Sequence, residues 1–362
     1  MEDVFVGIDL GTTGCKVGLY KRNGSLVAKE YAGYGLEVIS PGWVEQNPAD
    51  WWRSCCRALR KAMRIGGYRV KGISVSAQCP VVAPLDRDGN PLHKALLWMD
   101  RRSTEEVEVI ERELGVKLDP SLALPKILWF KRNRPNIYRR AFKFVQALDY
   151  IIYKLTGRFA TDWYTASTAL FDMDSLSYPE EIGSLIDVEL LPEPLPPGEI
   201  VGGVTEDASK QTGVPEGTPV VMGSIDAYLA ALGCGCVEPG MVCDVTGTST
   251  CIMAIHDKRV LDPLGRVFST RYLIGDFWVV GAVMTSTGAS LRWFKDNLGQ
   301  LEEVTSKLVG CDPYDLLLAE ASKAPVGSDG LIFLPYMSGE RSPIWDVRAR
   351  GVLIGLTLGH RR

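Results

Sequence analysis

Five residues near the N-terminus have the types and spacing of a site for a negatively charged ligand. Asp9 ends an apolar run, and Gly11, Thr12, Thr13 and Gly14 follow it in a short turn. Glycines let the backbone bend, and a bent backbone aims its N–H groups at one point. The threonines add hydroxyl groups, and the neighbouring carboxylate suits a hydrated Mg²⁺ ion. The spacing predicts a phosphate-binding turn, although an ordinary glycine-rich hairpin would have the same outline.

A second segment repeats this outline in the later part of the chain. Asp244 precedes Gly247 and Thr248, and an apolar run over residues 251–255 follows. Two Gly-Thr turns, one in each half, indicate a duplicated domain that closes on one phosphate chain.

Asp226 supplies a group that two phosphate-binding turns lack. It stands between an apolar run over residues 219–224 and an Ala-rich run over 227–232. In phosphoryl transfer a carboxylate accepts the proton of the acceptor hydroxyl, and a carboxylate of ordinary pKa suffices. An aspartate at a helix start is also a common N-cap. Both interpretations stay open, and the position between the two predicted domain cores favours the general base.

The surrounding elements follow from hydrophobic periodicity. Alternating apolar residues predict an antiparallel hairpin over residues 4–20 and a third strand over 26–31. A loop over 41–48 is expected before a capped helix over 48–64. The proline-rich stretch 185–203 is expected to be a surface loop. Further strands are predicted over 70–77, 219–224, 276–283 and 331–335, and helices over 103–114, 125–133, 135–144, 147–155, 161–171, 208–212, 291–298 and 313–323.

Composition limits the classes of protein to consider. A chain of 362 residues with 46% hydrophobic and 23% charged residues predicts two globular domains. The net charge is −4 and no basic tract occurs, so we expect no nucleic-acid partner. No apolar run is long enough to span a bilayer and the chain opens directly into a strand, so neither a membrane span nor a signal peptide is expected. Nine scattered cysteines without metal or redox spacing favour a reducing, cytoplasmic location.

Several separated segments resemble the FGGY family of carbohydrate kinases, within the actin, hexokinase and Hsp70 superfamily. The resemblance covers essentially the whole chain. It implies an α/β, ribonuclease H-like or actin-like ATPase fold with two similar domains, over residues 1–238 and 239–362. The segments that carry it are 121–133, which includes Lys126 and Trp129, 223–227, 246–249, 286–293, 336–343 and 351–356.

The resemblance also implies roles for particular residues and the cofactors ATP and Mg²⁺. Asp226 would be the general base and would touch the sugar, and Asp9 would lie near Mg²⁺, joined to it through water. The residues implied for the sugar pocket also have an ordinary structural explanation, since strand ends and loops commonly carry polar residues and a tryptophan commonly lies in a core. The nucleotide would be held by Asp9, Gly11, Thr12, Thr13, Gly247, Thr248 and Gly288, and the sugar pocket would be lined by Gln78, Trp98, Asp100 and Arg102.

Within the family, residues 42–52 and 338–341 look most like xylulose kinases, which implies a pentulose such as xylulose as the substrate. Cys79 and Pro80 stand where xylulose kinases carry Met-His and glycerol kinases Arg-Glu. The histidine that would touch the sugar in a xylulose kinase is therefore absent, and Pro80 has no backbone N–H to donate. The sequence therefore leaves the sugar open.

Members of the family continue beyond the Gly-Leu-Thr-Leu segment at residues 355–358, so the second domain is expected to be incomplete. Such a domain would expose apolar surface, which we expect either to be covered by another chain, as in a homodimer, or to leave the domain poorly ordered. Two alternatives remain beside a sugar kinase. One is a catalytically incomplete protein that binds a sugar or a nucleotide, and the other is an actin/Hsp70-type ATPase with no sugar. The signature at 121–133 argues against the ATPase.

Overall fold

The computed structural model describes residues 1–361, which form two compact units. Unit 1 comprises Met1–Leu232 and Arg271–Gly275. Unit 2 comprises Gly233–Thr270 and the chain from Asp276 onward.

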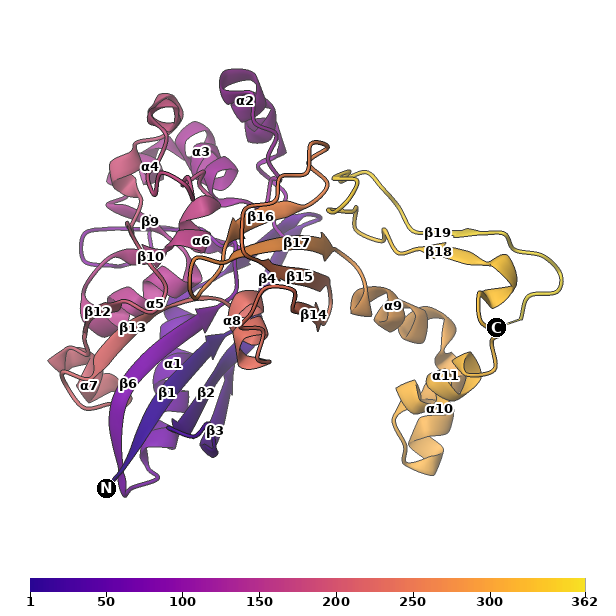
Figure 1. Cartoon of the computed structure of the whole chain (residues 1–362), viewed down its shortest axis with the longest axis horizontal. Helices are drawn as coiled ribbons and strands as arrows, with labels where there is room; N and C mark the ends of the chain where they lie inside the picture. The colour runs from indigo at the N-terminus through magenta and orange to yellow at the C-terminus, as the bar shows by residue number, and fades with distance from the viewer. Residues whose placement is uncertain (362) are drawn as a thin grey trace. The chain divides into compact units, whose positions relative to one another are not determined.

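A six-stranded sheet forms the centre of unit 1, in the order β12-β13-β6-β1-β2-β3 (Figure 1). The hairpin and the third strand predicted from sequence are confirmed, since β1, β2 and β3 pair antiparallel in succession. Strand β6 lies parallel to β1, and β13 lies parallel to β6. Three parallel strands therefore end at the same edge of the sheet. The bounds are β1 Glu2–Leu10, β2 Gly14–Lys21, β3 Leu26–Gly33, β6 Tyr68–Ala77, β12 Ile200–Gly203 and β13 Pro219–Ile225.

Alternation along the strands buries one row of side chains under helices α1 (Pro48–Met63), α5 (Ala147–Thr156) and α7 (Glu206–Thr212). Helix α1 begins at Pro48 because the side chain of Asn47 accepts a hydrogen bond from the Ala49 amide and proline suits the first helical turn. Its apolar face packs on β2 and β3. The buried residues of this face include Trp51, Cys55, Ala58, Leu59 and Ala62.

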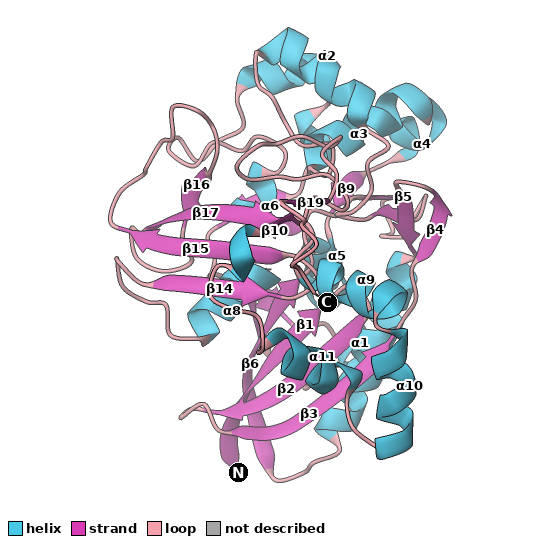
Figure 2. Ribbon diagram, turned by 90° about the vertical axis from the view of Figure 1, so that its right-hand side faces the viewer, coloured by secondary structure: helices cyan, strands magenta, loops and turns pink. Residues whose placement is uncertain are grey.

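A second apolar cluster of unit 1 lies around helices α2 (Thr104–Leu114), α3 (Ala123–Asn133) and α4 (Pro135–Arg140), which gather at one end of the unit (Figure 2). The helices predicted over residues 135–144 and 161–171 are too long. They run into short strands, because these segments pair with neighbours distant in sequence and local periodicity cannot show that pairing. These strands are β7 Ala83–Leu85 with β9 Lys143–Val145, and β10 Ala160–Asp162 with β11 Glu193–Leu195; helix α6 spans Trp163–Ser167.

Two predicted loops also contain strands. Residues 41–48 include β5 (Trp43–Gln46), which pairs with β4 (Glu37–Ser40) and β8 (Ala95–Leu96). The proline-rich stretch 185–203 includes β11, in which Pro194 itself lies opposite Thr161 of β10, and β12, which contains no proline. Short 3₁₀ helices complete unit 1 at Glu180–Ser184 and Val188–Leu190.

Unit 2 has a four-stranded sheet in the order β14-β15-β17-β16, with β14 and β15 forming the predicted second hairpin. Helix α10 and strand β16 were not predicted. Helix α8 (Asp226–Gly233) belongs to unit 1 up to Leu232, and the last residue of β16, Arg271, also belongs to unit 1. The bounds of the remaining elements are β14 Val242–Thr246, β15 Thr250–His256, β16 Phe268–Arg271, β17 Trp278–Met284, α9 Gly288–Leu298, α10 Gln300–Val309, α11 Pro313–Ala321, a 3₁₀ turn Ser328–Gly330, β18 Ile332–Leu334 and β19 Val352–Ile354.

Apolar side chains are exposed along α10 and the β18–β19 hairpin of unit 2, for example Leu301 and Leu308 on α10 and Phe333 on β18. This confirms the expectation of exposed apolar surface in the second unit. Across residues 1–361, no helix combines the length and apolar character that a bilayer span requires.

Candidate functional site

Four predicted parts of unit 1, namely Asp9, the Gly-Thr turn after it, Gln78 and Asp226, lie at the carboxyl edge of the three parallel strands. Leu10 of β1 lies opposite Ala77 of β6, and Ala77 lies opposite Ile225 of β13. Neighbouring strands lie about 4.8 Å apart. The next residue of each strand therefore begins the Gly-Thr turn predicted to bind phosphate (at residue 11), the Gln78 segment and the Asp226 segment along one edge.

The carbonyl groups of the turn after β1 accept hydrogen bonds from the protein, which leaves amide groups of the turn available to a ligand. Tyr34 Oη donates to the Gly11 carbonyl, Gln46 Nε2 donates to the Thr12 carbonyl at 2.6 Å, and the Tyr34 amide donates to the Thr13 carbonyl at 3.1 Å. Within residues 1–361, the amides of Thr12 and Thr13 donate to no protein acceptor. A pair of free N–H groups in a bent backbone can bind an anion.

Asp9 lies one residue before the end of β1, directly opposite Lys16 of β2. Lys16 Nζ is 2.9 Å from Asp9 Oδ2, and the side chain of Asp9 remains 37% exposed. The Asp9 carboxylate, which accepts the Lys16 hydrogen bond, raises the pKa of the lysine. Lys16 was missed in the sequence, although the register across a short turn places it opposite Asp9.

Asp226 begins helix α8 with one carboxylate oxygen engaged and one open. Oδ1 accepts a hydrogen bond from the Ala227 amide at 2.8 Å, whereas Oδ2 accepts none from the residues that the structure describes. The residue is accessible to solvent. Partial removal from water raises the pKa of Asp226 to about 6, with a smaller contribution from the Asp9 carboxylate, while the Ala227 amide opposes the rise. The cap interaction and an open oxygen thus coexist in one side chain.

Gln78 is 2% exposed and joins a hydrogen-bond network centred on Gln46. Gln78 Nε2 and Trp51 Nε1 donate to Gln46 Oε1 at 3.0 and 2.9 Å. Gln78 Oε1 is buried and has no partner among residues 1–361. Gln46 was missed because it lies in a segment predicted to be a loop, and only the fold brings it to Thr12 and Gln78.

Asp100 and Arg102 form a buried cluster in which the side chains are 0% and 1% exposed. Arg102 pairs with Asp100 and with Glu45, each at 2.8 Å, and its guanidinium lies 4.1 Å from the Trp43 ring centre. Asp100 also accepts the Val44 amide at 2.6 Å. The structure therefore places these two predicted sugar-pocket residues in the core, bonded to other protein groups.

Trp98 connects the loop over residues 97–102 to the Gly-Thr turn after β1, because Trp98 Nε1 donates a hydrogen bond to Thr12 Oγ1 at 3.1 Å. Behind it, the buried Lys126 donates to the Leu97 carbonyl at 2.6 Å and the Pro80 carbonyl at 3.1 Å. Burial lowers the pKa of Lys126 to about 7, although the Asp100 carboxylate opposes this. Lys126 thus holds together the two loops that carry the predicted sugar-binding residues.

Unit 2 has its own compact turn between β14 and β15. The amides of Gly288 and Ala289, at the start of α9, donate to the carbonyls of Gly247 and Thr248 at 3.1 and 3.0 Å. A β-carbon at Gly288 would overlap the Gly247 carbonyl oxygen, which explains the glycine. The structure therefore brings Gly247, Thr248 and Gly288 together, and their part in holding a nucleotide stays a prediction.

Comparison with known proteins identifies the family to which this site belongs. Residues 4–233 match the N-terminal domain of the FGGY family of carbohydrate kinases, and residues 243–361 match its C-terminal domain. The chain belongs to the FGGY family of carbohydrate kinases. This confirms the family resemblance, the class of enzyme as a phosphotransferase, and the actin-like, ribonuclease H-like α/β fold.

The relatives include two kinds of sugar kinase. The chain is 32% identical to a gluconokinase of Bacillus subtilis (strain 168) over its whole length and 73% of the relative, and 29% identical to a xylulose kinase of the same strain, covering 99% of this chain and 72% of the relative. Among solved structures, a ligand-bound xylulose kinase from Lactobacillus acidophilus has a TM-score of 0.88 at 28% identity, covering 99% of this FGGY chain and 74% of that chain. A gluconate kinase from the same organism has a TM-score of 0.89 at 28% identity, covering 100% and 74%.

Proposed function

We propose that this FGGY kinase transfers the γ-phosphoryl group of ATP to a sugar hydroxyl, with Asp226 as the general base. The observation that carries the proposal is the open Asp226 Oδ2, which lies on the same strand edge as the free amides of Thr12 and Thr13. Phosphoryl transfer needs these two features next to each other, because one group holds the phosphate chain and the other takes the proton of the acceptor hydroxyl.

The residues around the turn fit a Mg–nucleotide. Asp9 offers a part-exposed carboxylate beside the free amides, and Mg²⁺ is commonly held by one or two carboxylates together with phosphate oxygens and water. Bound Mg²⁺ would supply charge neutralisation on the phosphate chain. In this proposal Thr12 and Thr13 hold phosphate oxygens, and Gly247, Thr248 and Gly288 form the matching phosphate site of unit 2.

Among the four residues predicted to line the sugar pocket, Gln78 and Trp98 have side-chain atoms that a sugar could contact. Gln78 Oε1 is an unpaired acceptor that a sugar hydroxyl would satisfy, and Trp98 is only half-buried. Asp100 and Arg102 act as positioning residues, because their polar groups are bonded to the protein and fix the loop that carries Trp98.

We propose a pentulose such as xylulose as the substrate. Arg102 and Lys126 are buried and bonded to protein oxygens, and the neighbouring Arg101 is paired with Asp119, which favours a neutral sugar over a sugar acid. Gluconate is the second candidate, favoured by the 32% identity to a gluconokinase. ADP release measured with xylulose, ribulose, gluconate and glycerol tests this choice. We expect the highest kcat/KM with a pentulose, and a higher value with gluconate would overturn the substrate assignment.

The pH profile of the reaction follows from the state of Asp226. A general base must be unprotonated, and with a pKa of about 6 a falling pH protonates it. We expect kcat/KM to be level above pH 7 and to fall about tenfold per pH unit below 6. Steady-state rates between pH 5 and 8 check this, with circular dichroism at each pH to show that the fold persists. A profile that stays level down to pH 5 would contradict the assignment.

Gln46→Leu is expected to weaken both the fold and nucleotide binding. The change leaves the Gln78 amide, the Trp51 indole N–H and the Thr12 carbonyl without their partner and releases one end of the turn. Each unpaired buried group costs about 1–3 kcal/mol, so we expect the free energy of unfolding to fall by about 3 kcal/mol or more and the KM for ATP to rise. Urea unfolding and ATP titration measure the two effects.

Gln211→Leu is the matched control for this prediction, since Gln211 also accepts a hydrogen bond from a tryptophan, Trp52, but has no bond to the turn. It should lower stability without changing the KM for ATP. Equal KM values for ATP in both variants would show that Gln46 does not position the turn.

A further inference from the structure

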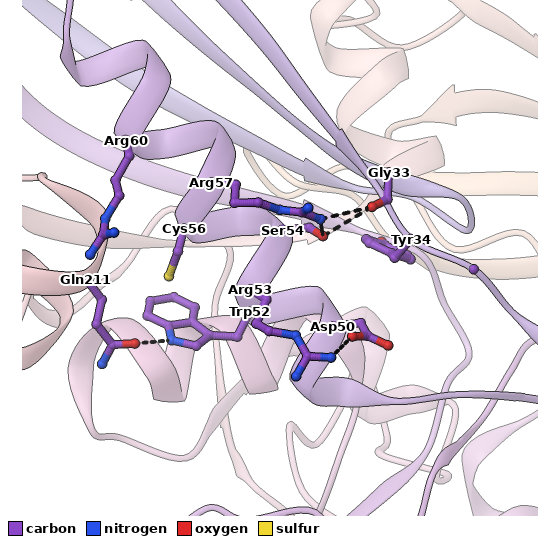
Figure 3. A pocket seen from close by; sticks show the side chains of 11 residues that line it. Gly33, Tyr34, Asp50, Trp52, Arg53, Ser54, Cys56, Arg57, Arg60 and Gln211 are labelled. Atoms are coloured by element: carbon purple, nitrogen blue, oxygen red, sulfur yellow. Dashed lines mark hydrogen bonds and ion pairs between the residues drawn. The ribbon is translucent and has the colours of Figure 1, made fainter.

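A groove in unit 1 lies between helix α1, the end of β3 and helix α7, and has a volume of about 580 Å³ (Figure 3). Small-molecule sites commonly enclose about 300–1,000 Å³. Trp52, only 6% exposed, lines the groove together with Cys56 and Gln211. None of the residues assigned above to phosphate or sugar binding lines it.

Three arginines of α1 line this groove, Arg53, Arg57 and Arg60; Arg57 turns toward Gly33, and Arg60 turns toward the α7 side (Figure 3). Arg53 forms an ion pair with Asp50. Arg57 and Arg60 bond to uncharged groups: Arg57 Nη2 donates to the Gly33 carbonyl at 3.2 Å and to Ser54 Oγ at 2.8 Å, and Arg60 Nη2 donates to the Lys210 carbonyl at 3.1 Å.

Within residues 1–361, neither Arg57 nor Arg60 has a carboxylate partner, and their remaining guanidinium N–H groups are open to the groove. Like charges three and four residues apart on a helix repel each other and lower its stability. An anion bound to Arg57 and Arg60 would relieve this repulsion in α1. This local positive charge is notable on a chain whose net charge is −4. Arginine binds phosphate oxygens with paired, charge-assisted hydrogen bonds.

Residues 33–34, which line the groove, form hydrogen bonds both to Arg57 of α1 and to the Gly-Thr turn after β1. Arg57 holds the Gly33 carbonyl, and the next residue, Tyr34, donates from its hydroxyl to the Gly11 carbonyl and from its amide to the Thr13 carbonyl. A ligand on Arg57 would therefore contact the segment that holds the turn.

We propose that the groove is a second ligand site, which binds the phosphate group of a small sugar phosphate through Arg57 and Arg60 with the Trp52 ring at its wall. The charge and geometry of the guanidinium groups select the phosphate, while the aromatic wall and the volume leave room for a sugar-sized body. The site does not depend on which sugar the enzyme phosphorylates, nor on Asp226 as the base.

Isothermal titration of the full chain with glucose 6-phosphate, in the absence of ATP, tests this site. The paired change Arg57→Gln and Arg60→Gln should weaken binding about tenfold or more, because it removes two charge-assisted contacts. The pair Arg112→Gln and Arg139→Gln, on the exposed surfaces of α2 and α4, removes the same charge elsewhere and should leave binding unchanged. Glucose should not bind at this site. Inorganic phosphate should bind more weakly than glucose 6-phosphate but with the same dependence on Arg57 and Arg60.

Equal affinity for glucose 6-phosphate in the wild type and the Arg57→Gln/Arg60→Gln variant would overturn the proposal. Should the glutamine pair fail to fold, Arg57→Lys with Arg60→Lys keeps the charge and loses the paired N–H geometry, and it must still weaken binding several-fold. This experiment measures binding and not turnover, so its result does not depend on whether the proposed kinase activity is correct.

Discussion

Asp226→Asn is expected to lower kcat by about 10²–10⁴-fold, the range that general base catalysis contributes. Asparagine keeps the shape of the side chain and can still accept the Ala227 amide through its carbonyl oxygen, which preserves the start of α8. It cannot take a proton from the sugar hydroxyl. Initial-rate measurements at saturating ATP and sugar give kcat, and calorimetric titration gives the sugar affinity, which should change little.

Ser224→Ala is a useful control, because Ser224 lies two residues earlier on β13 and is bonded to Asp162 rather than to the open edge. It should retain most of the activity. A kcat for Asp226→Asn within a few-fold of the wild type would remove Asp226 as the base, whereas loss of both activity and sugar binding would indicate a wider disruption of the edge.

Gly223→Ala is the structural change with the largest expected effect. A β-carbon at this position would overlap the carbonyl oxygen of Val75 in the adjacent strand β6. The register of β13 against β6 shifts between Val221 and Ser224, so the backbone there approaches its neighbour unusually closely. Because the obstacle is backbone and not a flexible side chain, we expect the free energy of unfolding to fall by about 2–4 kcal/mol.

The change should also reduce kcat, because Asp226 lies three residues further along the same segment. Gly7→Ala is the matched control: Gly7 lies within β1 of the same sheet, and a β-carbon there would make only ordinary contact, at 3.7 Å, with the Tyr20 ring. Chemical denaturation of the two variants compares the effects. Equal stability of Gly223→Ala and Gly7→Ala would show that β13 does not need its close approach to β6.

The hairpin with its Gly-Thr turn and the place of Asp226 at the end of a strand could be predicted from sequence because their signals are local, whereas their roles in binding and catalysis stay predictions. Alternating apolar residues fixed the strands of the first hairpin, and the Gly-Thr turn with its preceding Asp9 needed no distant partner to be seen. The strand β5 was missed because it is four residues long and lies between a Pro-Gly pair and a proline. Its pairing with β4 and β8 is decided by contacts beyond any local window.

The supporting residues of the site were harder to predict for the same reason. Gln46 gains its role from Thr12 and Gln78, residues more than thirty positions away in either direction. Asp100 and Arg102 look like ligand-binding groups in sequence, yet the fold surrounds them with Glu45 and Trp43 and buries their charges. Charged residues in a loop are therefore ambiguous until the packing around them is known.

Sugar-dependent phosphoryl transfer with Asp226 as the base is tested most directly by measuring the products of ATP and of the sugar in one reaction mixture. The wild-type chain and Asp226→Asn are incubated with ATP, Mg²⁺ and xylulose or gluconate, and both ADP and the phosphorylated sugar are quantified. We expect equal amounts of ADP and phosphorylated sugar from the wild type, little ADP when the sugar is omitted, and almost no product from the variant. ADP formation that is independent of sugar would instead support an actin/Hsp70-type ATPase, and sugar binding without any product would support a catalytically incomplete protein.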